Sequence, residues 1–158
     1  MAYVGVVGPS SADQRELDDA ESLGRGLAAR GHVVVCGGLG GIMEAVARGA
    51  AQAGGIVVGL LPGTDRSSAN PHVTVTIPTA LGEMRNALLV RSSDVVVSVG
   101  GSWGTLSEIA LAIRTGVPVI GIGGWQLTTA DGRTIDDGPR SVSSADAALE
   151  LLDDLLPR

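Results

Sequence analysis

The stretch VVVSVGGSWGTLSEIALAIRTGVPVIGI, residues 95–122, decides the fold. It begins with a continuous apolar run, which is typical of a strand buried on both faces of a parallel sheet. A glycine turn follows at residues 100–105, then an amphipathic helical segment that ends at Gly116, and then a second buried strand. The stretch therefore predicts a strand–turn–helix–strand unit. Its turn lies at the carboxyl end of a strand, where open α/β sheets bind their ligands.

The rest of the chain alternates strands and helices in the same way. Polar residues 62–72 indicate a loop, and Asp131-Gly132 is typical of a hairpin turn. This alternation predicts one α/β domain over residues 1–158, Rossmann-like and doubly wound, with a mostly parallel sheet and helices on both faces. The other expected strands are residues 3–7, 32–36, 56–61, 73–77 and 140–142, and the other expected helices are residues 13–30, 42–53, 79–91 and 145–156.

Composition limits the classes of partner. Of the 158 residues, 44% are hydrophobic and 18% are charged, which is typical of a globular domain. The net charge of −6 argues against nucleic acid, because phosphate backbones require basic surfaces. No apolar run is long enough to span a membrane, no signal peptide is visible, and Cys36 is the single cysteine. We therefore expect a cytoplasmic protein without a disulfide or a membrane partner.

Missing residue types exclude several cofactor sites. All eleven basic residues are arginine. A Walker-type P-loop and a pyridoxal phosphate enzyme both need a lysine, so neither is expected. The two histidines and the cysteine are not in ligand spacing, so we expect no metal site. The first strand ends in GPSS rather than in G-x-G-x-x-G, which disfavours NAD.

The first glycine turn, residues 100–105, has the features of a phosphate site. We expect backbone N–H groups of residues 101–105 and the Thr105 hydroxyl to donate to a phosphate. The alternative is a capping box, in which Thr105 caps the helix and Glu108 bonds back to it. A carboxylate on a first helical turn repels phosphate. Glu108 is therefore better suited to bonding ribose hydroxyls or to stabilising positive charge at an anomeric carbon.

Three further features are candidates for the same site. The second glycine turn, residues 37–41, either faces the first turn or serves only tight strand–helix packing. Arg85 lies beside the apolar stripe of its helix, where it either binds a phosphate or a leaving base, or is a solvated surface arginine. Trp103 either stacks on a base or forms a subunit contact.

Several segments resemble the "lonely guy" family of cytokinin-activating phosphoribohydrolases. GGSWGTLSE, residues 100–108, resembles the family motif P-G-G-x-G-T-x-x-E, and CGGLGGIMEAVARGAAQAGG, residues 36–55, resembles the G-G-G-x-x-G-L-M segment. GPSS resembles the early C-G-S-S turn. With LPGTDRSSAN at residues 61–70 and the Arg85-Asn86 pair, the order of motifs is similar to the branch that includes molybdenum cofactor carrier proteins. The resemblance spans residues 4–125.

The resemblance implies a nucleotide-type site. Arg85 and Glu108 occupy the positions of two catalytic residues of the hydrolases. Gly100, Ser102 and Asn86 stand where the hydrolase pattern has proline, glycine and lysine, which leaves the reaction and the base specificity open. The residues expected to bind the phosphate or nucleotide are Gly8, Ser10, Gly37, Gly38, Gly40, Gly41, Met43, Asn86, Gly100, Gly101, Ser102, Trp103, Gly104 and Thr105.

Two functions are consistent with these residues. The first is hydrolysis of the N-glycosidic bond of a nucleoside 5′-monophosphate to a free base and ribose 5-phosphate. Glu108 would then stabilise the oxocarbenium-like sugar, and Arg85 would offset charge on the departing base. The second is a carrier without chemistry for a phosphorylated pterin or nucleotide, such as molybdenum cofactor. Neither function requires a further cofactor.

We also expect a homodimer or a dimer of dimers. The predicted helix at residues 79–91 places Leu81, Met84 and Leu88 inward and carries more apolar residues than one face of a surface helix needs. Two-fold pairing would bury the same patch on both copies. The resemblance implies a pocket near the interface, and we expect the loop at residues 65–70 to complete the neighbour's pocket.

Overall fold

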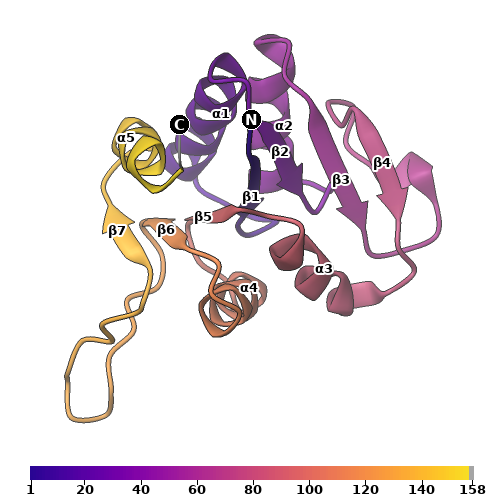
Figure 1. Ribbon diagram of the computed structural model, residues 1–158. Coiled ribbons are helices and arrows are strands. Elements are labelled where there is room, and N and C mark those ends of the chain that lie inside the picture. Colours follow the sequence, from indigo (N-terminus) through magenta and orange to yellow (C-terminus); the bar gives the residue numbers. More distant parts are fainter. Residues whose placement is uncertain (157–158) are drawn as a thin grey trace.

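Seven parallel strands form one sheet, in the order β4-β3-β2-β1-β5-β6-β7 (Figure 1). The computed structural model describes residues 1–156. The predicted Rossmann-like, doubly wound class is confirmed. The strands are β1 (Tyr3–Val7), β2 (Val33–Cys36), β3 (Val57–Leu61), β4 (Val75–Pro78), β5 (Val95–Val99), β6 (Val119–Ile122) and β7 (Arg140–Val142).

Helices cover both faces of this sheet (Figure 1). One face packs against α1 (Gln14–Ala29), α2 (Ile42–Gln52) and α5 (Ala145–Leu155), and the other against α3 (Arg85–Arg91) and α4 (Trp103–Arg114). Two short 3₁₀ turns, η1 (Arg66–Ser68) and η2 (Gly82–Met84), lie in the connections of β3 to β4 and of β4 to α3. The helices expected at residues 13–30, 42–53 and 145–156 are confirmed, with ends that differ by one residue.

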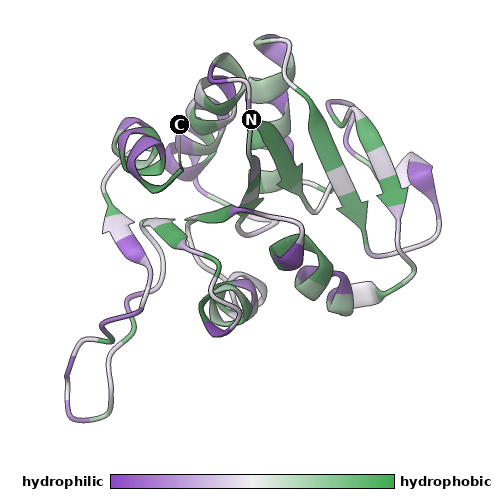
Figure 2. Ribbon diagram, in the orientation of Figure 1, coloured by the Kyte–Doolittle hydropathy of each residue, from purple (hydrophilic) through white to green (hydrophobic). Residues whose placement is uncertain are grey.

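The central strands are buried on both faces, as their unbroken apolar runs predict. Along β5, Val95, Val97 and Val99 join the core beneath α1, α2 and α5, while Val96 joins the core beneath α3 and α4. Figure 2 shows β2 in the green of hydrophobic residues. Each fully buried valine contributes about 1.5–3 kcal/mol. This two-sided burial holds the strand ends, and the turns that follow them, in fixed positions.

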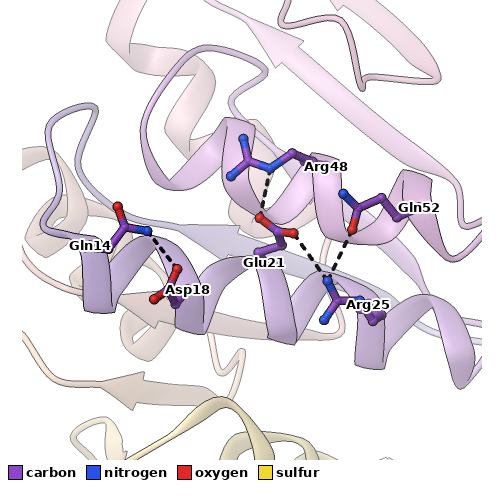
Figure 3. Close-up of polar contacts among 6 residues, drawn as sticks. All are labelled: Gln14, Asp18, Glu21, Arg25, Arg48 and Gln52. Atoms are coloured by element: carbon purple, nitrogen blue, oxygen red, sulfur yellow. Dashed lines mark hydrogen bonds and ion pairs between the residues drawn. The ribbon is translucent and has the colours of Figure 1, made fainter.

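The helices α1 and α2 cross at unusually close range. A Cβ atom on Gly49 would collide with the backbone carbonyl of Glu21, and one on Gly24 with that of Val46. Polar side chains rim this contact: Glu21 accepts from Arg48 Nε at 2.8 Å and from Arg25 at 3.3 Å (Figure 3). Glycine is required at the crossing because only a residue without a side chain lets the two backbones meet.

The helix expected at residues 79–91 is wrong in its first half. The N–H groups of Thr79, Ala80 and Gly82 donate to carbonyls of residues 61–63 rather than to a helical turn. Ala80 and Gly82 also adopt positive φ angles of 57° and 55°, which lie outside the range of an α-helix. The chain instead forms η2, and α3 begins only at Arg85.

The later start of α3 changes which of its side chains are buried. Leu89 and Val90 face the core, whereas Leu81, Met84 and Leu88, which we expected to point inward, are 49%, 76% and 40% exposed. The expected apolar face is therefore present, but it points to solvent. It lies beside the first turn of α4.

The predicted hairpin at Asp131-Gly132 is confirmed, and it extends away from the sheet (Figure 1). Thr128 and Thr134 form an antiparallel bridge, and Thr129 N–H donates to the Arg133 carbonyl at 2.9 Å. The chain then returns as β7, which pairs with β6 at the edge of the sheet.

Candidate functional site

A cleft of about 300 Å³ opens at the carboxyl ends of β1, β2 and β5. The strand order reverses here, because β1 pairs with β2 on one side and with β5 on the other. Doubly wound sheets bind their ligands at such a switch point. The cleft is lined by Val6, Val7, Gly8, Ser10, Gly37, Leu39, Met43, Pro62, Gly82, Glu83, Arg85, Asn86, Ser102, Gly104, Thr105 and Glu108.

Both glycine turns reach this cleft, as do the residues predicted to be catalytic. From the second turn, Gly37 faces the cleft, whereas Gly38 packs on Leu61 and Gly41 packs on the carbonyls of Pro9 and Ser10. The second glycine turn therefore both lines the cleft, through Gly37, and allows close packing, through Gly38 and Gly41. The predicted site residues that the structure brings together are Gly8, Ser10, Gly37, Met43, Arg85, Asn86, Ser102, Gly104, Thr105 and Glu108.

Six residues expected to contact a ligand do not line the cleft: Gly38, Gly40, Gly41, Gly100, Gly101 and Trp103. A Cβ on Gly100 would meet the Glu16 carboxylate, and one on Gly101 would meet the Trp125 ring. These two glycines therefore allow close packing of neighbouring elements. Trp103 is exposed beside the cleft.

Six lining residues were not predicted from the sequence: Val6, Val7, Leu39, Pro62, Gly82 and Glu83. Gly82 and Glu83 were hidden by the helix wrongly assigned to residues 79–91. Leu39 carried a usable signal, because it lies inside the second glycine turn. Pro62 follows β3 directly, and the carboxyl ends of parallel strands are where such sheets bind ligands, so its place in the sequence also indicated the site.

The first glycine turn leads into α4 at Trp103, three residues earlier than the capping-box alternative requires. Ser102 is the N-cap, and its hydroxyl accepts the Thr105 N–H at 3.2 Å and lies 3.0 Å from Thr105 Oγ1. The capping box with Thr105 as the cap is therefore wrong. The N–H groups of Trp103 and Gly104, at the first two helical positions, have no partner within the helix.

Arg85 is part of the cleft wall, so the alternative of a solvated surface arginine is wrong. Its Nη1 donates to the Leu60 carbonyl at 2.6 Å. Its Nε is buried and has no hydrogen-bond partner among the described residues. Burial lowers the pKa of Arg85, while Glu108 opposes that change. A cation with an unused buried donor is suited to an anionic ligand.

Glu108 is a buried carboxyl group in the same cleft. It is only 8% exposed, and no side chain in residues 1–156 donates a hydrogen bond to it. Burial raises its pKa from 4.5 to about 7, although Arg85 acts in the opposite direction. Glu108 is therefore partly protonated near neutral pH, which weakens its repulsion of a phosphate and suits proton transfer.

A second groove lies between α3 and the first turns of α4. Two of its apolar members, Met84 and Trp103, are 76% and 78% exposed. It shares Glu83, Asn86 and Gly104 with the cleft. The Trp103 ring lies 5.1 Å from that of Trp125, at an interplanar angle of 44°. An apolar surface therefore adjoins the polar cleft.

Two other kinds of feature are absent from residues 1–156. No group of three or more His, Cys, Asp or Glu side chains is placed there to hold a metal ion. Within the same residues, no helix has the length and apolar character needed to cross a membrane.

The fold is similar to that of proteins that bind or carry molybdenum cofactor. The molybdenum cofactor binding protein of the phototrophic bacterium Rippkaea orientalis is 32% identical, with a TM-score of 0.88 over 99% of this chain and 98% of that one. The molybdenum cofactor carrier protein of Chlamydomonas reinhardtii is 27% identical, with a TM-score of 0.83 over 99% of each chain.

The chain is also similar, more distantly, to a phosphoribohydrolase. A probable cytokinin riboside 5′-monophosphate phosphoribohydrolase of Oryza sativa is 36% identical over 110 residues, which are 67% of this chain and 48% of the rice protein. This chain thus spans about half the length of that relative. The model of the SLOG cluster4 family matches residues 1–149. With nearly the whole chain matched, and with the switch-point cleft in place, this protein belongs to the SLOG cluster4 family.

Proposed function

We propose that the cleft binds a phosphorylated small molecule and that the protein is a carrier of a phosphorylated pterin such as molybdenum cofactor. The observation that carries this proposal is the buried Nε of Arg85, a donor without a partner among the described residues, in a cleft that also receives the N-terminus of α4. Three kinds of donor converge there: a guanidinium, the hydroxyls of Ser102 and Thr105, and helical N–H groups.

The carrier role is favoured over hydrolysis by two arguments. The likeness to the molybdenum cofactor proteins extends over the whole of both chains, whereas the rice hydrolase is matched over about half its length. In addition, Ser102 replaces a glycine of the hydrolase motif and takes up the Thr105 N–H, which a glycine would leave free. The donor set of this chain therefore differs from that of the hydrolase motif.

The test is retention of the ligand through purification. We would produce the protein in a host that makes molybdenum cofactor, then measure molybdenum and phosphorylated pterin per protein chain. Arg85→Met should lose both, while Arg91→Met, a change of an exposed arginine on the same helix, should keep them. Retention that is absent from the wild type, or unchanged in Arg85→Met, would refute the proposal.

Hydrolysis of a nucleoside 5′-monophosphate is the second candidate function. It is supported by the shared cleft of Arg85 and Glu108 and by the carboxyl pKa of about 7, which suits an acid or base near neutral pH. The purified protein would be incubated with AMP and with N⁶-modified adenylates, and the released base measured. Turnover that disappears in Glu108→Gln supports this function, and no turnover above background rejects it.

We also propose that two copies pair through the exposed apolar surface of η2, α3 and α4. Leu81, Met84, Leu88 and Trp103 are all exposed there, beside the cleft. The loop at residues 65–70 is tied to its own chain, because Asn70 N–H donates to Gly38 and the Asn70 amide to Leu39. Its role in a neighbour's pocket stays a prediction. Sedimentation at micromolar concentration should give a dimer or tetramer, and Met84→Glu should shift it to the monomer.

A further inference from the structure

The peptide of Ser102 is held from two directions. Its carbonyl accepts the indole N–H of Trp125 at 2.9 Å and the N–H of Leu106 at 2.9 Å. Its hydroxyl accepts the Thr105 N–H and contacts the Thr105 hydroxyl. Trp125 does not line the cleft, yet it bonds directly to the residue that begins the helix there.

The turn that carries Trp125 packs against the first glycine turn. A Cβ on Gly101 would lie 3.1 Å from the Trp125 ring, and one on Gly124 would collide with the Gly100 carbonyl. Gly124 also has a positive φ of 79°. The turns after β5 and β6 thus meet through backbone and indole, which leaves the Ser102 peptide little freedom to rotate.

The hydroxyls of Ser102 and Thr105 retain one unused donor between them. A single hydrogen serves the 3.0 Å contact between the two oxygens, whichever of them donates it. The second hydroxyl hydrogen is free to point into the cleft, since both residues line it. A phosphate oxygen is the acceptor that fits a hydroxyl donor beside two helical N–H groups and an arginine.

We propose that Trp125 is a positioning residue for the phosphate group of the ligand. This inference rests on the proposed function. Its indole fixes the Ser102 peptide, and the fixed peptide aims the Ser102 and Thr105 hydroxyls and the N–H groups of Trp103 and Gly104 at one anion. In this assignment the unit binds only the phosphate group, so Trp125 should affect binding of the phosphate and not of the base or pterin ring.

The experiment compares phosphorylated probes with their dephosphorylated forms. AMP and 6-hydroxymethylpterin phosphate would be titrated beside adenosine and 6-hydroxymethylpterin. Trp125→Phe keeps an aromatic ring but removes the N–H. It should weaken binding of the phosphorylated probes about tenfold and leave binding of their dephosphorylated forms unchanged. Tyr3→Phe is the matched control, because it removes a polar group from an aromatic side chain that is 44% exposed at the start of β1, away from the cleft.

A double-mutant cycle tests the route of the effect. Ser102→Ala removes one of the donors that Trp125 positions, so the double variant should cost less affinity than the sum of the two single changes; a fully additive loss would contradict this route. The chain has two tryptophans, so in Trp103→Phe all tryptophan fluorescence comes from Trp125. Binding of a phosphorylated probe should change that fluorescence emission.

The outcomes separate the inference from the proposed function. Wild-type protein that binds neither phosphorylated probe overturns both. Wild-type protein that binds a phosphorylated probe, with Trp125→Phe binding it equally well, overturns the inference alone. Equal losses for phosphorylated and dephosphorylated probes would mean that Trp125 only supports the fold, and that result also overturns the inference.

Discussion

Replacing Glu108 by glutamine should stabilise the ligand-free protein above neutral pH. Burial raises the pKa of this carboxyl from 4.5 to about 7, with Arg85 opposing the rise. At about 1.4 kcal/mol for each unit of pKa, an ionised Glu108 costs the folded state roughly 3 kcal/mol. A glutamine side chain would occupy the same volume without a charge, so the Glu108→Gln variant should recover most of this free energy.

The sign follows from which state binds the proton. Below pH 4.5 the carboxyl is protonated in both the folded and the unfolded chain, so its contribution to the free energy of unfolding is zero. Between pH 4.5 and about 7 the Glu108 carboxyl is ionised in the unfolded chain but protonated in the folded chain. The free energy of unfolding therefore falls as pH rises through this range. Above about 7 the whole cost is present.

Urea unfolding at several pH values measures this directly. The wild type and Glu108→Gln should have nearly equal free energies of unfolding at about pH 4.5 and should differ by roughly 3 kcal/mol at about pH 8. Glu150→Gln, a change of an exposed carboxyl on α5, is the control and should follow the wild type throughout. A constant difference between wild type and Glu108→Gln across this range would refute the reasoning.

Three further predictions concern single positions. Gly49→Ala should destabilise the fold by about 2 kcal/mol or more, because its Cβ would meet the Glu21 backbone. Gly40→Ala should leave the urea midpoint unchanged, because no atom of the described residues lies within 4 Å of its Cβ. Gly37→Ala should weaken AMP or pterin phosphate binding with a smaller effect on melting temperature, because its Cβ would displace the Arg85 guanidinium; equal binding in a titration would contradict this. Ser144→Ala should cost about 1 kcal/mol, since Ser144 accepts the Ala147 N–H at the start of α5; an unchanged free energy of unfolding would show that the cap is dispensable.

Patterns that depend on neighbours along the chain were predictable. The runs at residues 33–36 and 95–99 are buried on both faces because every residue in them is apolar or small, and helix-period patterns placed α1, α2 and α5. The location of the glycine turns and of Glu108 at the site was predictable, because they come directly after such strands. These features need only local sequence and the rule that parallel strands end at one edge.

Features that depend on distant partners were not predictable. The segment at residues 79–84 leaves the helix because its N–H groups bond to residues 61–63, and no local signal identifies those acceptors. The bond from the Trp125 indole to Ser102 spans 23 residues and two turns. The burial of Arg85 against Gly37 also required the arrangement of three elements in space.

The parallel sheet separates the molecule into a ligand end and an opposite end that is free for attachment. Every turn that follows a strand lies at the cleft edge, while the turns that follow α1, α2 and α4 lie at the other. Gly31, Gly54 and Gly116 close those helices in exposed positions, with no described atom within 4 Å of a Cβ built there. Their φ angles of 72°, 73° and 77° favour glycine, so an attachment should leave these residues in place and follow them. Fluorophores, affinity tags or surface tethers inserted at these turns would therefore report on or immobilise the protein without obstructing the cleft.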